Sequence, residues 1–215
     1  MLENPVKSIY LGVGSNLGNK RKYIEQAKFR LLQNNIKIKK TEIGVVIRQD
    51  MLENRVKSIY LGVGSNLGNK RKYIEQAKFK LLQNDIRIIK TSSFYESLSW
   101  PNPNNPKFLN IVLEIVTDLS PIKLLNTCKK IEVSLGRKKR SKNAPRECDI
   151  DLLDYNSKKI NKNIILPHPR LHIRNFVLLP LYELNKDWIH PNLKLPIKKL
   201  ILSLGNKDIR SIKQI

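Results

Sequence analysis

The stretch SIYLGVGSNLGNKRKYIEQAKFKLLQNDIRIIKTSSFYES, residues 58–97, decides the fold. It opens with a short apolar run, 58–64, that is rich in β-forming residues and ends in glycines, which predicts a strand. From Leu67 to Leu82, apolar residues recur at spacings of three and four, which predicts a helix. Residues 86–97 predict a second strand. A strand–helix–strand unit cannot bury its apolar faces alone, so it must pack against the rest of the chain.

The first 41 residues return almost unchanged at 51–91, with differences at five positions. Two copies are too few for a solenoid, so we interpret them as a recent tandem duplication. The second copy runs directly into more predicted sheet and is expected to join the main core. A charge, Lys39, also stands where the second copy has Ile89 in its predicted strand. We therefore predict an appendage without catalytic function, 1–50, and a main domain, 51–215.

The remaining chain adds strands and helices in no strict alternation. Residues 109–119 and 148–155 predict strands, and 120–136 predicts a helix with Pro121 at its first turn and Gly136 after its end. A further helix is expected at 171–185, followed by a loop and a short helical tail. This order favours an α+β fold, an antiparallel sheet with helices packed on it.

The chain has 41 basic and 18 acidic residues, a formal net charge of +23. Such a charge predicts an anionic partner, either a phosphorylated small molecule or nucleic acid. An AT-rich genome, which encodes much lysine, asparagine and isoleucine, is an alternative explanation. The sequence has no apolar stretch long enough for a membrane span and no apolar run at its start. Cys128 and Cys148 are expected to be reduced thiols in the core of a cytoplasmic protein.

The chemistry is concentrated in KNAPRECDIDLL, residues 142–153. On a strand, Asp149 and Asp151 share one face about 6.6 Å apart, while Cys148, Ile150 and Leu152 face the core. Two such carboxylates suit Mg²⁺, although the spacing alone favours a solvated pair of aspartates on an edge strand. Six lysines and arginines between 137 and 146 adjoin the pair, and this favours a site for a triphosphate.

The same run, 142–153, resembles the signature of the 6-hydroxymethyl-7,8-dihydropterin pyrophosphokinases of folate synthesis. Other elements similar to that family follow in the same order and cover about 57–205. They are YLGVGSNLG (60–68), SSFYES (92–97), FLN (108–110), IE (131–132), LPHP (166–169), RNFVLLPL (174–181) and IHP (189–191).

The resemblance implies a ferredoxin-like sheet, preceded here by the duplicated unit, and the transfer of pyrophosphate from ATP to the pterin hydroxymethyl group with release of AMP. It implies two Mg²⁺ ions on Asp149 and Asp151, which with Arg137 and Arg146 are the expected catalytic residues. The expected ATP-binding residues are Lys129, Glu132, Arg137, Lys139, Arg146, His168 and Arg174. The expected pterin-binding residues are Ser97, Leu98, Trp100, Phe108, Asn110 and Phe176, with the ring between Phe108 and Phe176.

The chain departs from the family pattern at Lys129, Asn143 and Pro169, where a glutamine, an aromatic residue and a tyrosine are familiar. The glycine run 62–68 is interpreted as a tight turn beside the pterin pocket, and His172 and His190 as isolated structural residues. We expect a monomer that binds neither nucleic acid nor membrane. The alternatives are a nucleic-acid-binding module, for which no motif is present, and a relic whose fold the duplication has broken.

Overall fold

The computed structural model describes residues 58–99, 102–138 and 143–215. In this part of the chain an antiparallel sheet has the order β5–β1–β4–β3–β6, and β2 also pairs with β4. The strands are β1 (Ile59–Ser65), β2 (Arg87–Thr91), β3 (Tyr95–Ser97), β4 (Phe108–Val116), β5 (Asp149–Tyr155) and β6 (Ile212–Gln214). The α+β architecture predicted from the sequence is therefore confirmed.

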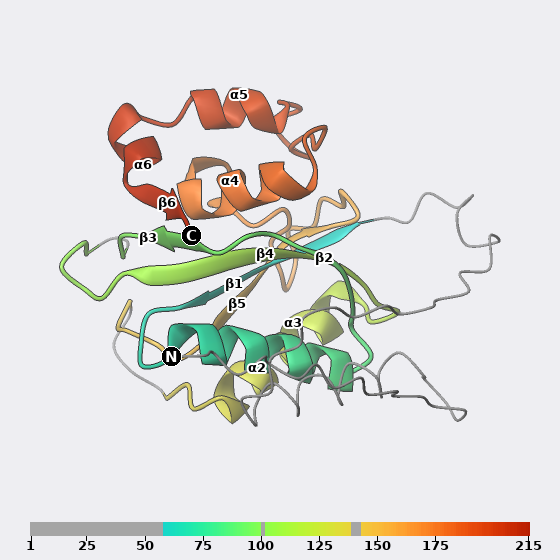
Figure 1. Cartoon of the computed structure of the whole chain (residues 1–215). Coiled ribbons are helices and arrows are strands. Elements are labelled where there is room, and N and C mark those ends of the chain that lie inside the picture. Colours follow the sequence, from blue (N-terminus) through green and yellow to red (C-terminus); the bar gives the residue numbers. More distant parts are fainter. Residues whose placement is uncertain (1–57, 100–101, 139–142) are drawn as a thin grey trace, which may run out of the picture. The chain divides into compact units, whose positions relative to one another are not determined.

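Helices cover both faces of this sheet (Figure 1). On one face lie α2 (Lys70–Gln83) and α3 (Pro121–Ser134), and on the other lie α4 (Asn175–Leu184) and α5 (Ile197–Leu202). The short helices η2 (Leu171–Ile173) and α6 (Asn206–Arg210) flank α4 and α5 in the chain. The second copy of the repeat supplies β1, α2 and β2. Residues 1–50 lie outside the described residues, so the division at residue 50 stays a prediction.

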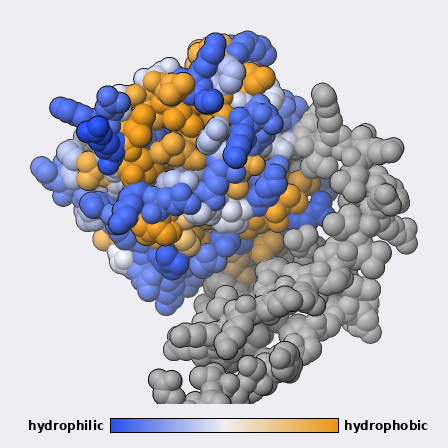
Figure 2. Space-filling model, turned by 45° about the horizontal axis from the view of Figure 1, so that its top comes forward, coloured by the Kyte–Doolittle hydropathy of each residue, from blue (hydrophilic) through white to orange (hydrophobic). Residues whose placement is uncertain are grey.

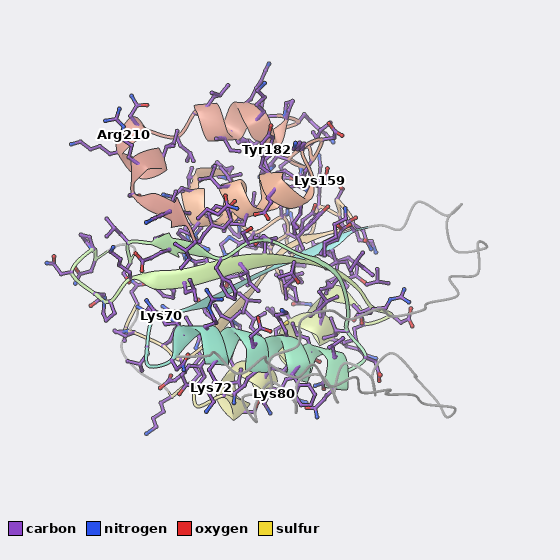
Figure 3. All side chains as sticks on the ribbon, in the orientation of Figure 1. Lys70, Lys72, Lys80, Lys159, Tyr182 and Arg210 are labelled. Carbon is purple, nitrogen blue, oxygen red and sulfur yellow. The ribbon has the colours of Figure 1, made fainter. Side chains whose placement is uncertain are left out.

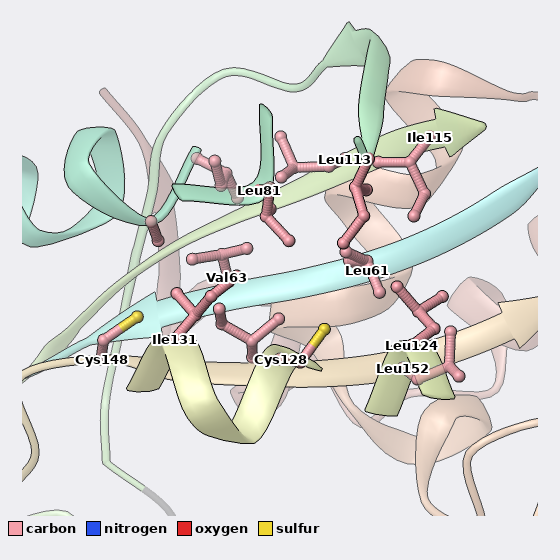
Figure 4. Packing of buried hydrophobic residues seen from close by; sticks show 14 of the residues in the cluster. Leu61, Val63, Leu81, Leu113, Ile115, Leu124, Cys128, Ile131, Cys148 and Leu152 are labelled. Carbon is pink, nitrogen blue, oxygen red and sulfur yellow. The ribbon is translucent and has the colours of Figure 1, made fainter. Parts of the chain in front are cut away.

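Alternation along the strands gives the sheet two cores. Leu61, Val63 and Ile150 pack with α2 and α3, whereas Tyr60 and Leu153 pack with α4 and α5. Figure 4 shows the first core, in which Leu81 of α2 and Cys128 and Ile131 of α3 meet the strands. Both cysteines are buried free thiols, as expected, and burial raises the pKa of Cys128 to about 12.

The predicted strand 86–97 is two strands in the structure. β2 ends at Thr91 and β3 begins at Tyr95, because the chain between them is held from outside the sheet. The carboxylate of Glu183 on α4 accepts hydrogen bonds from the Ser93 amide and hydroxyl at 2.9 Å and from the Tyr95 hydroxyl at 3.0 Å. The predicted helix 171–185 is likewise divided, into η2 and α4.

The Ile89 side chain does not enter the core. Ile88 pairs with Ile115 and Lys90 with Glu114, so the register shifts at Ile89, which is 42% exposed. A lysine at the equivalent position would stay in water, because a bulged residue in an edge strand is turned out of the ladder. The charge of Lys39 at this position is therefore no reason to prefer the second copy over the first.

The outer surface is strongly basic. Figure 3 shows Lys70, Lys72 and Lys80 along α2 and Arg210 on α6. In the view of Figure 2, hydrophilic residues surround an apolar area. None of the helices in the described part of the chain combines the length and the apolar character that a membrane crossing requires.

Candidate active site

A cleft opens on the sheet face that α4 covers, and its floor is bare backbone. Gly62 and Gly64 of β1 line it, and Gly64 pairs with Asn110 of β4 and Asp149 of β5. A Cβ atom at Gly64 would lie 2.8 Å from Asn110 Oδ1, and one at Gly62 would lie 3.4 Å from Leu153. A side chain would therefore be crowded at Gly64, whereas at Gly62 it would make an ordinary contact with Leu153. Both glycines lie inside a strand, and only Gly68, at φ +62°, belongs to the expected turn.

The two aspartates share the cleft face of β5, as the alternation predicts. Asp149 and Asp151 both line the cleft, while Cys148, Ile150 and Leu152 are in the first core. Asp149 is paired with two arginines, at 2.6 Å from Arg137 and 3.0 Å from Arg146. Burial alone would raise the pKa of Asp149, but these two cations outweigh it and hold the pKa below its usual value.

Glu132 stands behind this pair rather than in the cleft. Its side chain is 2% exposed, with Oε2 2.5 Å from Arg137 and Oε1 2.8 Å from Lys129. Oε1 also accepts a 2.7 Å hydrogen bond from the backbone amide of Ile150 on β5, the edge strand. Burial raises the pKa of Glu132, and Lys129 partly reverses the shift. Glu132 thus ties α3 to the sheet edge and holds Arg137 from behind.

Asp151 faces a second set of partners, which come from the segment between β5 and α4. Arg174 donates to Asp151 at 3.0 Å, and His168 Nε2 lies 3.9 Å away. Burial lowers the pKa of His168, with a partial opposing effect of Asp151, so the ring is neutral near pH 7. Its Nδ1 accepts from the Arg170 amide at 3.2 Å, which places the ring proton on Nε2, toward Asp151.

The other end of the cleft is lined by two phenylalanines and a buried amide. Phe108 begins β4, and Phe176 lies on α4 with the Arg174 guanidinium 5.4 Å from its ring centre. Asn110 Nδ2 donates to Ser97 Oγ at 3.0 Å and to the Tyr95 carbonyl at 3.4 Å. These bonds turn Oδ1, the acceptor, toward the floor at Gly64.

The structure brings most of the predicted site residues into one cleft. Those that line it are Ser97, Leu98, Phe108, Asn110, Lys129, Arg137, Arg146, Asp149, Asp151, His168, Arg174 and Phe176. Glu132 does not line the cleft, and Trp100 and Lys139 lie outside the described residues. Arg170 also lines the cleft, although nothing in the sequence indicated this. Gly62 and Gly64, expected in a turn beside the pterin pocket, line the cleft from inside a strand, and Asn143 lines it too. The spacing of the two glycines in GVG, on one face of a strand, could have indicated that they form the floor of a cleft.

One end of the cleft carries paired carboxylates and arginines, and the other end carries aromatic rings. This combination suits an enzyme that transfers a phosphoryl group to a flat ring compound. Residues 60–186 match the 7,8-dihydro-6-hydroxymethylpterin-pyrophosphokinase (HPPK) family. The chain belongs to this family.

Known relatives agree with this assignment. The chain is 43% identical over 109 residues to the 2-amino-4-hydroxy-6-hydroxymethyldihydropteridine pyrophosphokinase of Aquifex aeolicus, and 39% identical over 103 residues to that of Haemophilus influenzae. These matches cover 50% and 47% of this chain, and 68% and 64% of the relatives. A Plasmodium falciparum HPPK-DHPS structure shares the fold, with TM-score 0.56, 15% identity, and coverage of 76% of this chain and 48% of that one. The protein is thus a pyrophosphokinase of folate synthesis that acts on hydroxymethyldihydropterin.

Proposed function

We propose that the cleft binds ATP at the end that carries Asp149 and Asp151 and the pterin between Phe108 and Phe176. The hydroxymethyl oxygen then attacks the β-phosphorus in line, the bond from the β-phosphorus to the bridging oxygen of the α-phosphate breaks, and AMP leaves with that oxygen while the hydroxyl proton passes to solvent. The observation that carries this proposal is that the two aspartates and the two phenylalanines line one cleft, on one face of the sheet. We assign this sheet to the ferredoxin-like fold, which the strand order β5–β1–β4–β2 supports. Catalysis then consists of positioning and charge stabilisation, for which this chemistry needs no covalent intermediate on the protein.

The donor set of the acidic end suits Mg²⁺. Asp149 and Asp151 provide hard oxygen ligands, and in the described residues no group of three or more His, Cys, Asp and Glu side chains forms a complete metal site. Mg²⁺ accepts such a site, because it takes its remaining ligands from water and substrate phosphates. Two bound ions would neutralise phosphate oxygens and align the transferred group.

The arginines have two alternative partners in this scheme. In the structure, Arg137 and Arg146 neutralise Asp149, and Arg174 neutralises Asp151. When the carboxylates bind cations, the same guanidinium groups become available to the phosphate oxygens, to which they bind strongly. Glu132 keeps Arg137 at the cleft wall during this exchange, because its contact with Arg137 does not depend on Asp149.

His168 is suited to donate a hydrogen bond rather than a charge. With Nδ1 occupied by the Arg170 amide, the neutral ring presents Nε2–H beside Asp151. A phosphate oxygen near Asp151 would accept a hydrogen bond from this N–H, while the proton stays on the ring. The opposite end of the cleft selects the pterin by its flat shape and by a hydrogen bond, because Oδ1 of Asn110 can accept from an N–H at the edge of the pterin ring.

The test is to compare Asp149→Asn, Asp151→Asn and the unchanged enzyme for pterin-dependent AMP formation and for Mg²⁺-dependent binding of an ATP analogue. Asn keeps the shape and loses the charge, so both variants should stay folded. We expect turnover to fall by about 100-fold or more, with the Mg²⁺ dependence of ATP binding lost. Near-normal turnover in either variant would show that the carboxylates do not hold the metal.

The remaining expectations concern the whole chain. We infer that it works as a cytoplasmic monomer and that its positive charge serves anionic substrates rather than nucleic acid. Sedimentation of the full chain and a DNA-binding assay at several salt concentrations test this inference. Tight binding that weakens steeply with salt would support a nucleic-acid partner instead.

A further inference from the structure

Asn66, just after β1, makes contacts with two separate loops that border the cleft, although it does not line the cleft itself. Its side chain is buried, at 2% exposure. Three of its four hydrogen-bonding positions are used: both N–H groups of Nδ2 donate, and Oδ1 accepts. A buried amide that is satisfied in this way fixes the geometry of all its partners.

On one side Asn66 fixes the backbone of Arg146. The Asn66 amide donates to the Arg146 carbonyl at 3.1 Å, and the Arg146 amide donates to Asn66 Oδ1 at 2.8 Å. Both backbone groups of Arg146 are thus bonded to one residue. The Arg146 guanidinium then reaches Asp149 at 3.0 Å. The side chain that reaches Asp149 therefore starts from a backbone position that Asn66 holds.

On the other side Asn66 joins the two ends of the loop 98–107, which connects β3 to β4. Nδ2 donates to Ser99 Oγ at 3.2 Å and to the Pro106 carbonyl at 3.1 Å, and Ser99 Oγ donates to that same carbonyl at 2.6 Å. Leu98 precedes this junction and Phe108 follows it, and both line the cleft. The junction therefore sets the distance between two walls of the proposed pterin site.

We propose that Asn66 is a positioning residue that holds Arg146 and the two ends of the β3–β4 connection, at Ser99 and Pro106, in one arrangement. The phosphate end and the pterin end of the cleft then keep their relative positions. This inference rests on the proposed roles of Arg146 and of the pterin site. Asn66 touches no reacting atom, and its effect passes through its two neighbours. A displacement of about 1 Å at the reacting groups can cost roughly 100-fold in rate.

The first experiment measures kcat and KM for the pterin, per mole of folded full-length enzyme. Asn66→Ala removes both sides of the junction, so kcat should fall by roughly 100-fold and KM should rise. Ser99→Ala removes a contact on the loop side alone, so KM should rise by a larger factor than kcat falls. Asn66→Asp keeps an acceptor for the Arg146 amide and loses the donors. It should therefore recover much of kcat while KM stays raised.

The duplication offers a matched control. Asn16 has the same sequence neighbours as Asn66, from Gly12 to Gly18, and Asn16→Ala should leave kcat and KM unchanged. The inference is overturned if folded Asn66→Ala has normal kcat and KM, or if Asn16→Ala carries the defect instead. Arg146→Ala separates this result from a failure of the proposed function. If Arg146→Ala is inactive while Asn66→Ala is normal, only the positioning role is wrong, whereas active Arg146→Ala contradicts the catalytic assignment.

Discussion

At the scale of single residues, alternation along β5 was sufficient to place Asp149 and Asp151 together, because strand geometry leaves no other choice. The partners of Glu132 could not be predicted in this way. Its role depends on Ile150 having a free amide at a sheet edge, which is a property of the assembled sheet. The resemblance to the family indicated that Glu132 matters, but not that it lies behind Arg137 rather than in the cleft.

Phe108 tests the pterin end. Phe108→Ala should weaken pterin binding by 2- to 10-fold or more, since stacking contributes about 0.5–1.5 kcal/mol beyond the buried area, and ATP binding should change little. Calorimetry with each substrate measures both effects. Phe94→Ala is the control, because Phe94 packs against the first core and under Arg71, away from the cleft. Unchanged pterin affinity in Phe108→Ala would make this ring a core residue.

His190 makes folding stability depend on pH. It is 4% exposed, and burial, helped by His172, lowers its pKa to about 4. The two rings lie 5.7 Å apart, so the expectation that they are isolated is wrong. Because the unfolded chain takes up this proton near pH 6.5 and the folded chain does so only near 4, stability is complete above 6.5. It falls as the pH drops toward 4, by at most about 3 kcal/mol.

The variant that checks this pH effect is His190→Asn. In the structure, the backbone amides of Asn192 and Leu193 donate hydrogen bonds to Nδ1 of His190. The side-chain oxygen of an asparagine at this position can still accept both hydrogen bonds. Urea unfolding at pH 7.5 and pH 4.5 should show a smaller stability difference in the variant than in the unchanged enzyme. Equal differences in the two proteins would assign the pH dependence to other groups.

At the scale of elements, the long strands and helices follow from periodicity, whereas the short ones depend on distant partners. The helix over 120–136 and the strands near 109–119 and 148–155 lie close to their predicted positions. The break at Ser93 depends on Glu183, 90 residues away. β6 was missed because three residues are too few to show a period, and it forms only because β3 offers a free edge.

β6 supports the cleft through β3, which carries Ser97. Removal of residues 212–215 would leave β3 paired on one side only, because Ser97 pairs with Phe108 of β4 and Ile212 of β6. We expect the melting temperature to fall by several degrees and KM for the pterin to rise, with a smaller change in kcat. Lys213→Ala is the control that keeps the strand. Equal KM values in the truncated and full chains would mean that β4 alone positions Ser97.

At the scale of the whole molecule, the duplication raises the question of which copy builds the catalytic domain. In the described residues the second copy supplies β1, α2 and β2, and the chain continues from it through β3 into the loop 98–107. Since a packed core has no volume for a second helix, only one copy can fill this place. The choice rests on this connection, because the exposed side chain of Ile89 removes the argument from charge.

Deletion of residues 1–50 should therefore leave a soluble enzyme with unchanged kcat and KM. Deletion of 51–91 is the matched variant, and it should be insoluble or inactive. The measurements are expression in the soluble fraction and pterin-dependent AMP formation. The opposite pattern, with activity retained only in the second deletion, would show that the first copy fills the place of β1, α2 and β2.

The bare floor at Gly62 and Gly64 has a consequence for drug resistance. A flat inhibitor that lay on this floor would contact main-chain atoms, and no point mutation can delete those. Substitution could only add a side chain, which at Gly64 would meet Asn110 Oδ1 at 2.8 Å and would obstruct the natural substrate together with the drug. Escape would have to come from the walls of the cleft, so inhibitors that draw most of their contact from the floor should lose the least potency to point mutations.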